Sequence, residues 1–186
     1  MLLRNTDNAF GSVSQFLHWM MALAIFSLFG LGLWMTSLTY YDPWYTRGPF
    51  IHEGIGVIVS TLLIFRLYWR LTNIRPDDSD LRPFERGGAL FAHWSMYGLI
   101  SAIVVSGYLI STGDGRSLDV FGLFAVPSVV QGEKLADSAG AVHYYAAFTL
   151  IGVSVIHTLA ALKHHFIDKN FTLRRMLPGH SSKTET

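Results

Sequence analysis

The sequence predicts an all-α integral membrane protein, a four-helix bundle that crosses the bilayer four times. Of the 186 residues, 51% are hydrophobic and only 15% are charged, against about 25% charged in a typical soluble domain. Four long apolar runs follow one another, each with about the 20 residues that a helix needs to cross the hydrocarbon core. Lys and Arg residues gather on one side of the resulting layout, as they do in membrane proteins.

The four predicted spans cover about residues 14–38, 50–71, 89–110 and 138–162. Helices are expected because backbone polar groups in lipid must be satisfied within the segment, and the runs alternate too poorly for barrel strands. The first run is longer than the apolar core of a signal peptide and no small-residue cleavage pattern follows it, so we interpret it as a retained span. The apolar segment 120–127 is expected to lie on the membrane surface. A single domain is therefore predicted over residues 1–177, followed by a mobile tail at 178–186.

The distribution of basic residues predicts the orientation. Eleven of the fourteen Lys and Arg residues fall at the termini and around the loop between the second and third spans, and three fall on the other side, namely Arg47, Arg116 and Lys134. Because cytoplasmic loops are enriched in Lys and Arg, both termini are expected in the cytoplasm. The sequence therefore predicts a multi-pass membrane protein, with lipid as a partner and no nucleic acid.

Cysteine is absent from the sequence, and its absence limits the chemistry. It excludes disulfides, thiolate metal sites, iron–sulfur clusters and covalently attached c-type haem. Any haem must therefore be held non-covalently by histidine or methionine.

Histidines in the predicted spans are the main functional signal. Ionisable side chains are costly in a membrane and need a reason, and a neutral imidazole is a standard haem ligand. The alternating directions of the spans place His18 and His157 near the inner side, and His52 and His143 near the outer side. His143 and His157 are fourteen residues apart, so they share one helix face about 21 Å apart along the axis.

Two levels of paired histidines predict two haems in the core of the bundle. Each iron would receive one ligand from the fourth helix and one from a facing helix. A single membrane histidine is more often a packing residue, but four at two matched levels are hard to explain in that way. Each level offers two ligands, too few for a closed zinc site. Six-coordinate iron has no open position, which favours electron transfer over oxygen chemistry.

The histidine framework resembles the bacterial cytochrome b561 family and, more distantly, the di-haem cytochrome b subunits of hydrogenases and formate dehydrogenases. The resemblance covers nearly the whole chain. The segments that carry it are Phe16-Leu-His-Trp19, Ile51-His-Glu-Gly54, Phe91-Ala-His-Trp94, Val142-His-Tyr144, Ile156-His-Thr-Leu-Ala-Ala-Leu-Lys-His-His165 and Phe166-Ile-Asp-Lys-Asn-Phe-Thr-Leu-Arg-Arg-Met176.

The resemblance implies four helices, two b haems and electron exchange with a membrane quinone, ubiquinone or menaquinone. Its axial ligands match His18, His52, His143 and His157. One branch of the family is associated with oxidising superoxide at the outer face and reducing ubiquinone, so the outer electron donor is either superoxide or a redox protein. Two alternatives stay open: a membrane anchor that passes electrons between a peripheral oxidoreductase and quinone, and a transporter or metal carrier without redox function.

Further residues have a functional and a structural interpretation each. His93 and Arg70, with Arg66 one turn before it, are candidates for binding a haem propionate or quinone, or else pack at the interface. His164 lies two turns beyond His157 and is a candidate quinone ligand and proton relay, or else an interfacial anchor. Gly32, fourteen residues beyond His18, would admit the outer haem or serve helix packing, as would Gly30. Glu53, beside His52, would either tune the outer haem or face water, and it is expected to face water.

Overall fold

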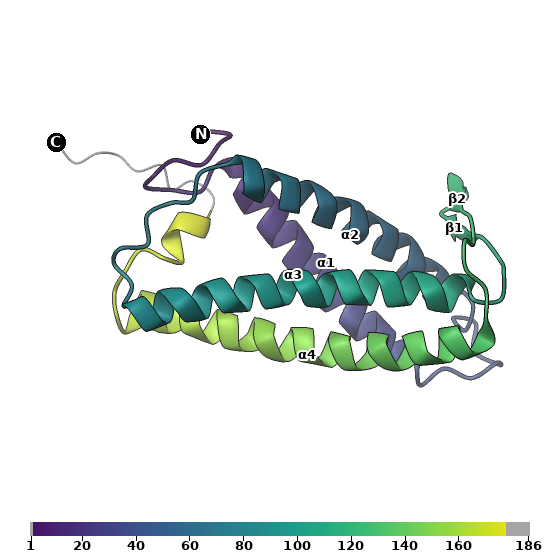
Figure 1. The fold of residues 1–186 in the computed structure, drawn as a ribbon. Coiled ribbons are helices and arrows are strands. Elements are labelled where there is room, and N and C mark those ends of the chain that lie inside the picture. Colours follow the sequence, from purple (N-terminus) through teal and green to yellow (C-terminus); the bar gives the residue numbers. More distant parts are fainter. Residues whose placement is uncertain (1, 178–186) are drawn as a thin grey trace.

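A computed structural model describes residues 2–177 and contains four long helices with a small β-hairpin (Figure 1). Each helix is long and apolar enough to cross a membrane, so the predicted membrane four-helix bundle is confirmed. The predicted tail at 178–186 lies outside the described residues. The elements are α1 (Ser12–Met35), α2 (Arg47–Thr72), α3 (Pro83–Thr112), β1 (Leu118–Val120), β2 (Phe124–Val126), α4 (Glu133–Phe166) and a 3-10 helix (Arg174–Met176).

The helices differ from the predicted spans mainly at their ends. The spans count only apolar residues, whereas a helix continues into polar sequence where its end groups are satisfied. α3 begins at Pro83, six residues before the predicted span, because proline suits the first helical position and the Glu85 carboxylate accepts the Arg82 backbone N–H at 3.1 Å. α4 extends from Glu133 to Phe166, beyond both ends of the predicted 138–162.

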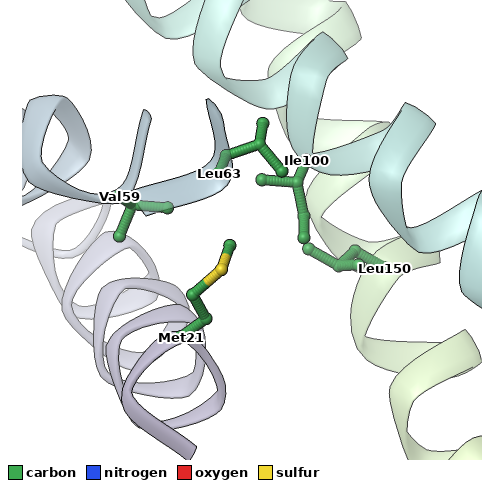
Figure 2. Close-up of a cluster of buried hydrophobic side chains, with 5 residues drawn as sticks. All are labelled: Met21, Val59, Leu63, Ile100 and Leu150. Carbon is green, nitrogen blue, oxygen red and sulfur yellow. The ribbon is translucent and has the colours of Figure 1, made fainter. Parts of the chain in front are cut away.

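The four helices alternate in direction and pack as two pairs (Figure 1). α1 lies along α2 and α3 lies along α4, while α2 and α3 also touch. The backbones of α1 and α4, and of α2 and α4, approach each other much less closely. The small core takes side chains from all four helices (Figure 2): Met21, Val59, Leu63, Ile100 and Leu150.

Large apolar side chains cover the outside of the bundle. Phe16, Ile64 and Ile156, for example, are 61%, 71% and 68% exposed. In water such a surface would promote aggregation, whereas apolar side chains are favourable where they contact lipid. The distribution therefore agrees with a helical bundle surrounded by lipid.

We call the end of the bundle where α1 begins and α4 ends the terminal end, and the opposite end the hairpin end. At the terminal end, the buried Gln15 amide donates to the carbonyls of Phe10 and Arg175, both at 3.1 Å. The Trp19 indole donates to the Met176 carbonyl at 2.9 Å. These bonds tie the start of α1 to the 3-10 helix, so the chain end is fixed to the first span.

At the hairpin end, segment 120–127 forms part of a β-hairpin. β1 pairs antiparallel with β2 around a turn at Phe121 and Gly122, whose φ angles are 55° and 71°. Leu118 and Val120 are buried, and β1 contacts α2 and α3. The sequence did not predict these strands, since three residues are too few for a periodic signal.

Gly54 of α2 leaves the space in which the hairpin packs against the helix. The Phe121 ring lies against Gly54, where an added Cβ would collide with it, and also packs on Phe50 at 5.7 Å between ring centres. Phenylalanine at positive φ is strained, so the packing of its ring must hold the turn.

We expect Gly54→Ala to destabilise the protein by about 1–3 kcal/mol, because the new methyl group must displace the Phe121 ring. Gly56→Ala is the matched control, since a Cβ there meets nothing within 4 Å and alanine favours the helix. Thermal unfolding in detergent should show a lower Tm for Gly54→Ala only. Equal Tm values for the two variants would contradict the role given to Gly54.

Candidate functional site

The structure brings the four span histidines together as two pairs. His18 of α1 faces His157 of α4, with ring centres 6.4 Å apart. His52 of α2 faces His143 of α4, with ring centres 6.1 Å apart. These are the pairs that the span directions predict, and each bridges the two helix pairs of the bundle. Because His143 and His157 are fourteen residues apart on α4, the pairs lie at two separate levels.

The spacing within each pair fits a metal bound between two imidazoles. A metal–imidazole nitrogen bond is about 2.0 Å, and each ring centre lies about 1.2 Å behind its nitrogen, so the ring centres should be about 6 Å apart. Both pairs meet this value. Two ligands per level leave four equatorial positions for other donors, and those are the positions that a porphyrin supplies. The residues present therefore fit a bis-histidine haem at each level.

The pair at the hairpin end is the better prepared for a metal. His143 Nδ1 lies 3.0 Å from the Ile103 carbonyl oxygen of α3. A carbonyl only accepts, so Nδ1 carries the proton and Nε2 keeps its lone pair. A hydrogen bond of this kind from the far nitrogen orients a ligand imidazole and sets its tautomer.

Two glycines give the same pair its space. An added Cβ at Gly107 of α3 would lie 3.1 Å from His143 Cε1, and one at Gly32 of α1 would lie 3.4 Å from His52 Cε1. Gly32 was singled out from the sequence and does lie beside His52, whereas nothing lies within 4 Å of a Cβ at Gly30. Gly107 was missed, because only the tertiary contact with His143 distinguishes it from other helical glycines.

The pair at the terminal end has a third histidine and a cation beside it. The His93 ring centre lies 5.2 Å from that of His157, closer than two imidazoles on opposite sides of one metal would lie. The Arg66 guanidinium donates to His18 Nδ1 at 3.0 Å. The buried Nδ1 atoms of His93 and His52 have no hydrogen-bond partner among residues 2–177. One buried imidazole nitrogen is thus left unpaired at each level, which is unusual for a buried polar atom and needs an explanation.

Arg70 packs against aromatic side chains of α3. Its guanidinium lies 5.6 Å from the ring centres of both Trp94 and Tyr97 of α3, and Arg66 lies 5.8 Å from Tyr97. A guanidinium stacked on aromatic rings is held in place at modest cost. Two arginines therefore flank the level of His18 and His157.

Glu53 corrects one prediction. It was expected to face water, but the Ser111 hydroxyl of α3 donates to its carboxylate at 2.8 Å. The residue is partly buried between α2 and α3. The sequence could not show that the next helix places a hydroxyl opposite this carboxylate.

His164 belongs to a charged cluster at the terminal end. It is buried, and its Nδ1 lies 2.7 Å from Asp168 Oδ2. Lys163 joins Asp168 at 2.8 Å and Glu85 of α3 at 2.7 Å. Sequence reasoning found His164 but missed the other three, although the i,i+4 spacing of His164 and Asp168 was a visible signal.

Comparison with known proteins decides the family. The model of the prokaryotic cytochrome b561 family matches residues 9–179. The chain is 42% identical over 184 residues to cytochrome b561 homolog 2 of Escherichia coli K12, covering 98% of each chain. It is 31% identical over 167 residues to a probable superoxide oxidase, CybB, of Yersinia pestis, covering 87% of this chain and 92% of the relative.

The chain belongs to the prokaryotic cytochrome b561 family. A third relative, cytochrome b561 homolog 1 of Escherichia coli K12, is 26% identical over 188 residues and covers 92% of this chain. Membership confirms the resemblance inferred from the histidine segments. This cytochrome b561 is thus a bacterial membrane protein that binds b-type haem and transfers electrons in the membrane.

Proposed function

We propose that this cytochrome b561 passes electrons across the bilayer through two bis-histidine b haems and exchanges them with a membrane quinone. His18 and His157 would hold one haem, and His52 and His143 the other. The observation that carries the proposal is that two imidazole pairs, at two levels, each have the spacing that a shared metal requires. Bound haem iron supplies a site that takes up and releases one electron at a time.

The chain's own side chains bind and orient these groups. The Ile103 carbonyl holds His143 in the tautomer whose Nε2 can ligate, and Gly107 and Gly32 make room for the imidazoles. Each haem would be held by two histidines, which would leave no ligand position free for oxygen. That arrangement supports electron transfer over oxygen binding.

Arg66, Arg70 and His93 are proposed to bind carboxylates or quinone at the terminal end. A His18 that ligates through Nε2 carries its proton on Nδ1, where it can no longer accept from Arg66. Arg66 is then free to pair with an anionic carboxylate such as a haem propionate. His93, with its unpartnered Nδ1, can donate to a propionate or a quinone oxygen.

We infer that the terminal end faces the cytoplasm of a bacterial inner membrane. The support is that ten of the thirteen Lys and Arg residues in the described part of the chain lie toward that end. The haem of His18 and His157 is then the inner one. The quinone, ubiquinone or menaquinone, would react on that side.

Superoxide is the proposed donor at the outer face. The support is the relative named a probable superoxide oxidase, at 31% identity, together with the three outer basic residues Arg47, Arg116 and Lys134. Arg116 pairs with Asp114 at 2.5 Å, so Arg47 and Lys134 are the better candidates for steering an anion. In the balanced reaction, two superoxide ions give two O2 and two electrons, which with two protons convert one quinone to quinol.

Stopped-flow mixing tests the donor. When oxidised protein is mixed with superoxide, the α-band of reduced haem should appear. Superoxide dismutase added beforehand should abolish this signal. Quinone added next should reoxidise the protein. Absence of reduction by superoxide would reject this donor.

The alternative is a membrane anchor for a peripheral oxidoreductase. It would use the same histidines and the same quinone, with a protein as donor. Co-purification of a stoichiometric redox subunit from native membranes, combined with no reaction with superoxide, would favour it.

A further inference from the structure

Four titratable side chains form one continuous hydrogen-bonded chain at the terminal end. Glu85 Oε1 accepts from Lys163 Nζ at 2.7 Å, Lys163 Nζ reaches Asp168 Oδ2 at 2.8 Å, and the same oxygen lies 2.7 Å from His164 Nδ1. We call this set the Glu85–His164 network. It joins the start of α3 to the end of α4.

Local backbone structure aims Asp168 back at His164. α4 ends at Phe166, and the Asp168 and Asn170 amides donate to the Lys163 and His164 carbonyls, at 3.1 and 3.0 Å. Lys169 adopts a left-handed φ of 55° in this reversal. The turn thereby brings the Asp168 carboxylate over the last turn of the helix, beside the His164 ring.

The network runs from water to the interior. The side chains of Lys163 and Asp168 are 43% and 30% exposed, whereas that of His164 is only 11% exposed. A cavity of about 270 Å³ adjoins the network and is lined by Asp80, Arg82, Glu85, Asp168 and Asn170. Polar side chains thus lead from this cavity to one buried imidazole.

His164, the buried member of the network, lies on α4 near the level at which we propose that quinone reacts. His164 lies seven residues beyond His157, which is two turns and about 10 Å along the same face of α4. A group between these histidines would have the inner haem ligand on one side and a titratable imidazole on the other.

We propose that the Glu85–His164 network delivers cytoplasmic protons to the quinone, with His164 as the final donor. The inference rests on the proposed quinone reaction and names a proton route for it. Quinone takes two electrons from the protein and two protons to become quinol. His164, as an imidazolium whose Nδ1 proton is held by the Asp168 carboxylate, gives its Nε2 proton to a quinone oxygen. The neutral imidazole keeps its Nδ1 proton and takes the next proton, which comes from cavity water, at Nε2 before the second transfer.

The charges of the network suit this task. The hydrogen bond from Lys163, with a smaller contribution from His164, holds the pKa of the Asp168 carboxyl below its usual range, so Asp168 is ionised at neutral pH. As a carboxylate it accepts from His164 Nδ1, leaving Nε2 to exchange the proton. Imidazole is the side chain whose ordinary titration lies near neutrality. Lys163 and Glu85 face the same carboxylate and, with Asp80 and Arg82 of the cavity, complete its charged surroundings.

A purely structural role is the competing explanation, since ion pairs near the surface often contribute only about 0–1 kcal/mol. Asp168→Asn separates the two roles because it preserves size and hydrogen bonding but cannot ionise. Asp78→Asn is the matched control: it removes another carboxylate at the same end, one that pairs with Arg86 at 3.1 Å.

The experiment uses the reduced holoprotein in detergent, mixed with a short-chain ubiquinone from pH 6 to 9. We expect Asp168→Asn and His164→Gln to slow reoxidation on the order of 10-fold or more, increasingly so at high pH, with proton uptake from a pH indicator slowed equally. Added imidazole should restore the rate. Reoxidation by ferricyanide, which takes electrons without protons, should be unchanged in all variants, and Asp78→Asn should match the wild type.

The outcomes distinguish a failure of the proton route from a failure of the proposed quinone reaction. If the wild type reduces quinone and both variants do so at its rate, the proton route is wrong and the proposed function stands. If both variants lose haem or stability, the network is structural and the route is again overturned. If the wild type does not reduce quinone, the proposed function fails and the route fails with it.

Discussion

His157→Ala is expected to leave one haem per chain, the one held by His52 and His143. The substitution removes one of two imidazoles whose ring centres lie 6.4 Å apart, and α4 offers no second imidazole facing His18 at that level among the described residues. The other pair, fourteen residues away, keeps its Ile103 contact. Haem quantified per chain by its pyridine adduct should fall from two to about one, and one of two redox transitions should vanish.

His52→Ala should have the converse effect, removing the haem at the hairpin end. His93→Ala is the informative control, because the His93 ring centre lies 5.2 Å from that of His157, too close for the two imidazoles to bind opposite sides of one iron. This variant should retain two haems. If His93→Ala, rather than His18→Ala, loses the inner haem, the pairing at the terminal end is wrong.

Gly107→Leu is expected to lose the outer haem, although Gly107 is not a ligand and lies far from His143 in the sequence. A Cβ at Gly107 would lie 3.1 Å from His143 Cε1 and 3.3 Å from its Nδ1, so a leucine side chain must push the ring off the Ile103 carbonyl. Without that bond the imidazole loses both its orientation and its tautomer, and ligand-orienting bonds of this kind contribute about 10–100-fold in metal affinity.

Gly98→Leu is the matched control on the same helix. Nothing lies within 4 Å of a Cβ at Gly98, so the new side chain meets open space. The control should hold two haems, whereas Gly107→Leu should hold about one, with the spectrum of the inner pair intact. Full haem content in Gly107→Leu would show that the contact between Gly107 and His143 does not position the ligand.

The histidine levels could be predicted because they depend only on the position of each histidine along its own helix. Span length against bilayer thickness gives each residue a depth, and 3.6 residues per turn places His143 and His157 on one face. Depth and face together were enough to pair His18 with His157 and His52 with His143, and the structure brings the same residues together. Whether they ligate haem stays a prediction.

The supporting contacts could not be predicted in the same way. Gly107 beside His143, Ser111 opposite Glu53 and Phe121 on Gly54 each join residues from different elements. Such contacts depend on the rotation and offset of one helix against another. Side-chain packing sets both, and periodicity within a single segment carries no information about them.

The sequence by itself determined the number of spans, their alternating directions, their charge asymmetry and the two histidine levels, because lipid thickness, helical pitch and the cost of buried charge act on each segment separately. The tertiary structure alone decided which backbone carbonyl orients His143, where the hairpin rests, and that Glu85 of α3 meets Lys163 and, through it, Asp168 and His164 at the end of α4. These contacts required two or more segments to pack together, and packing is a property of their relative placement in space.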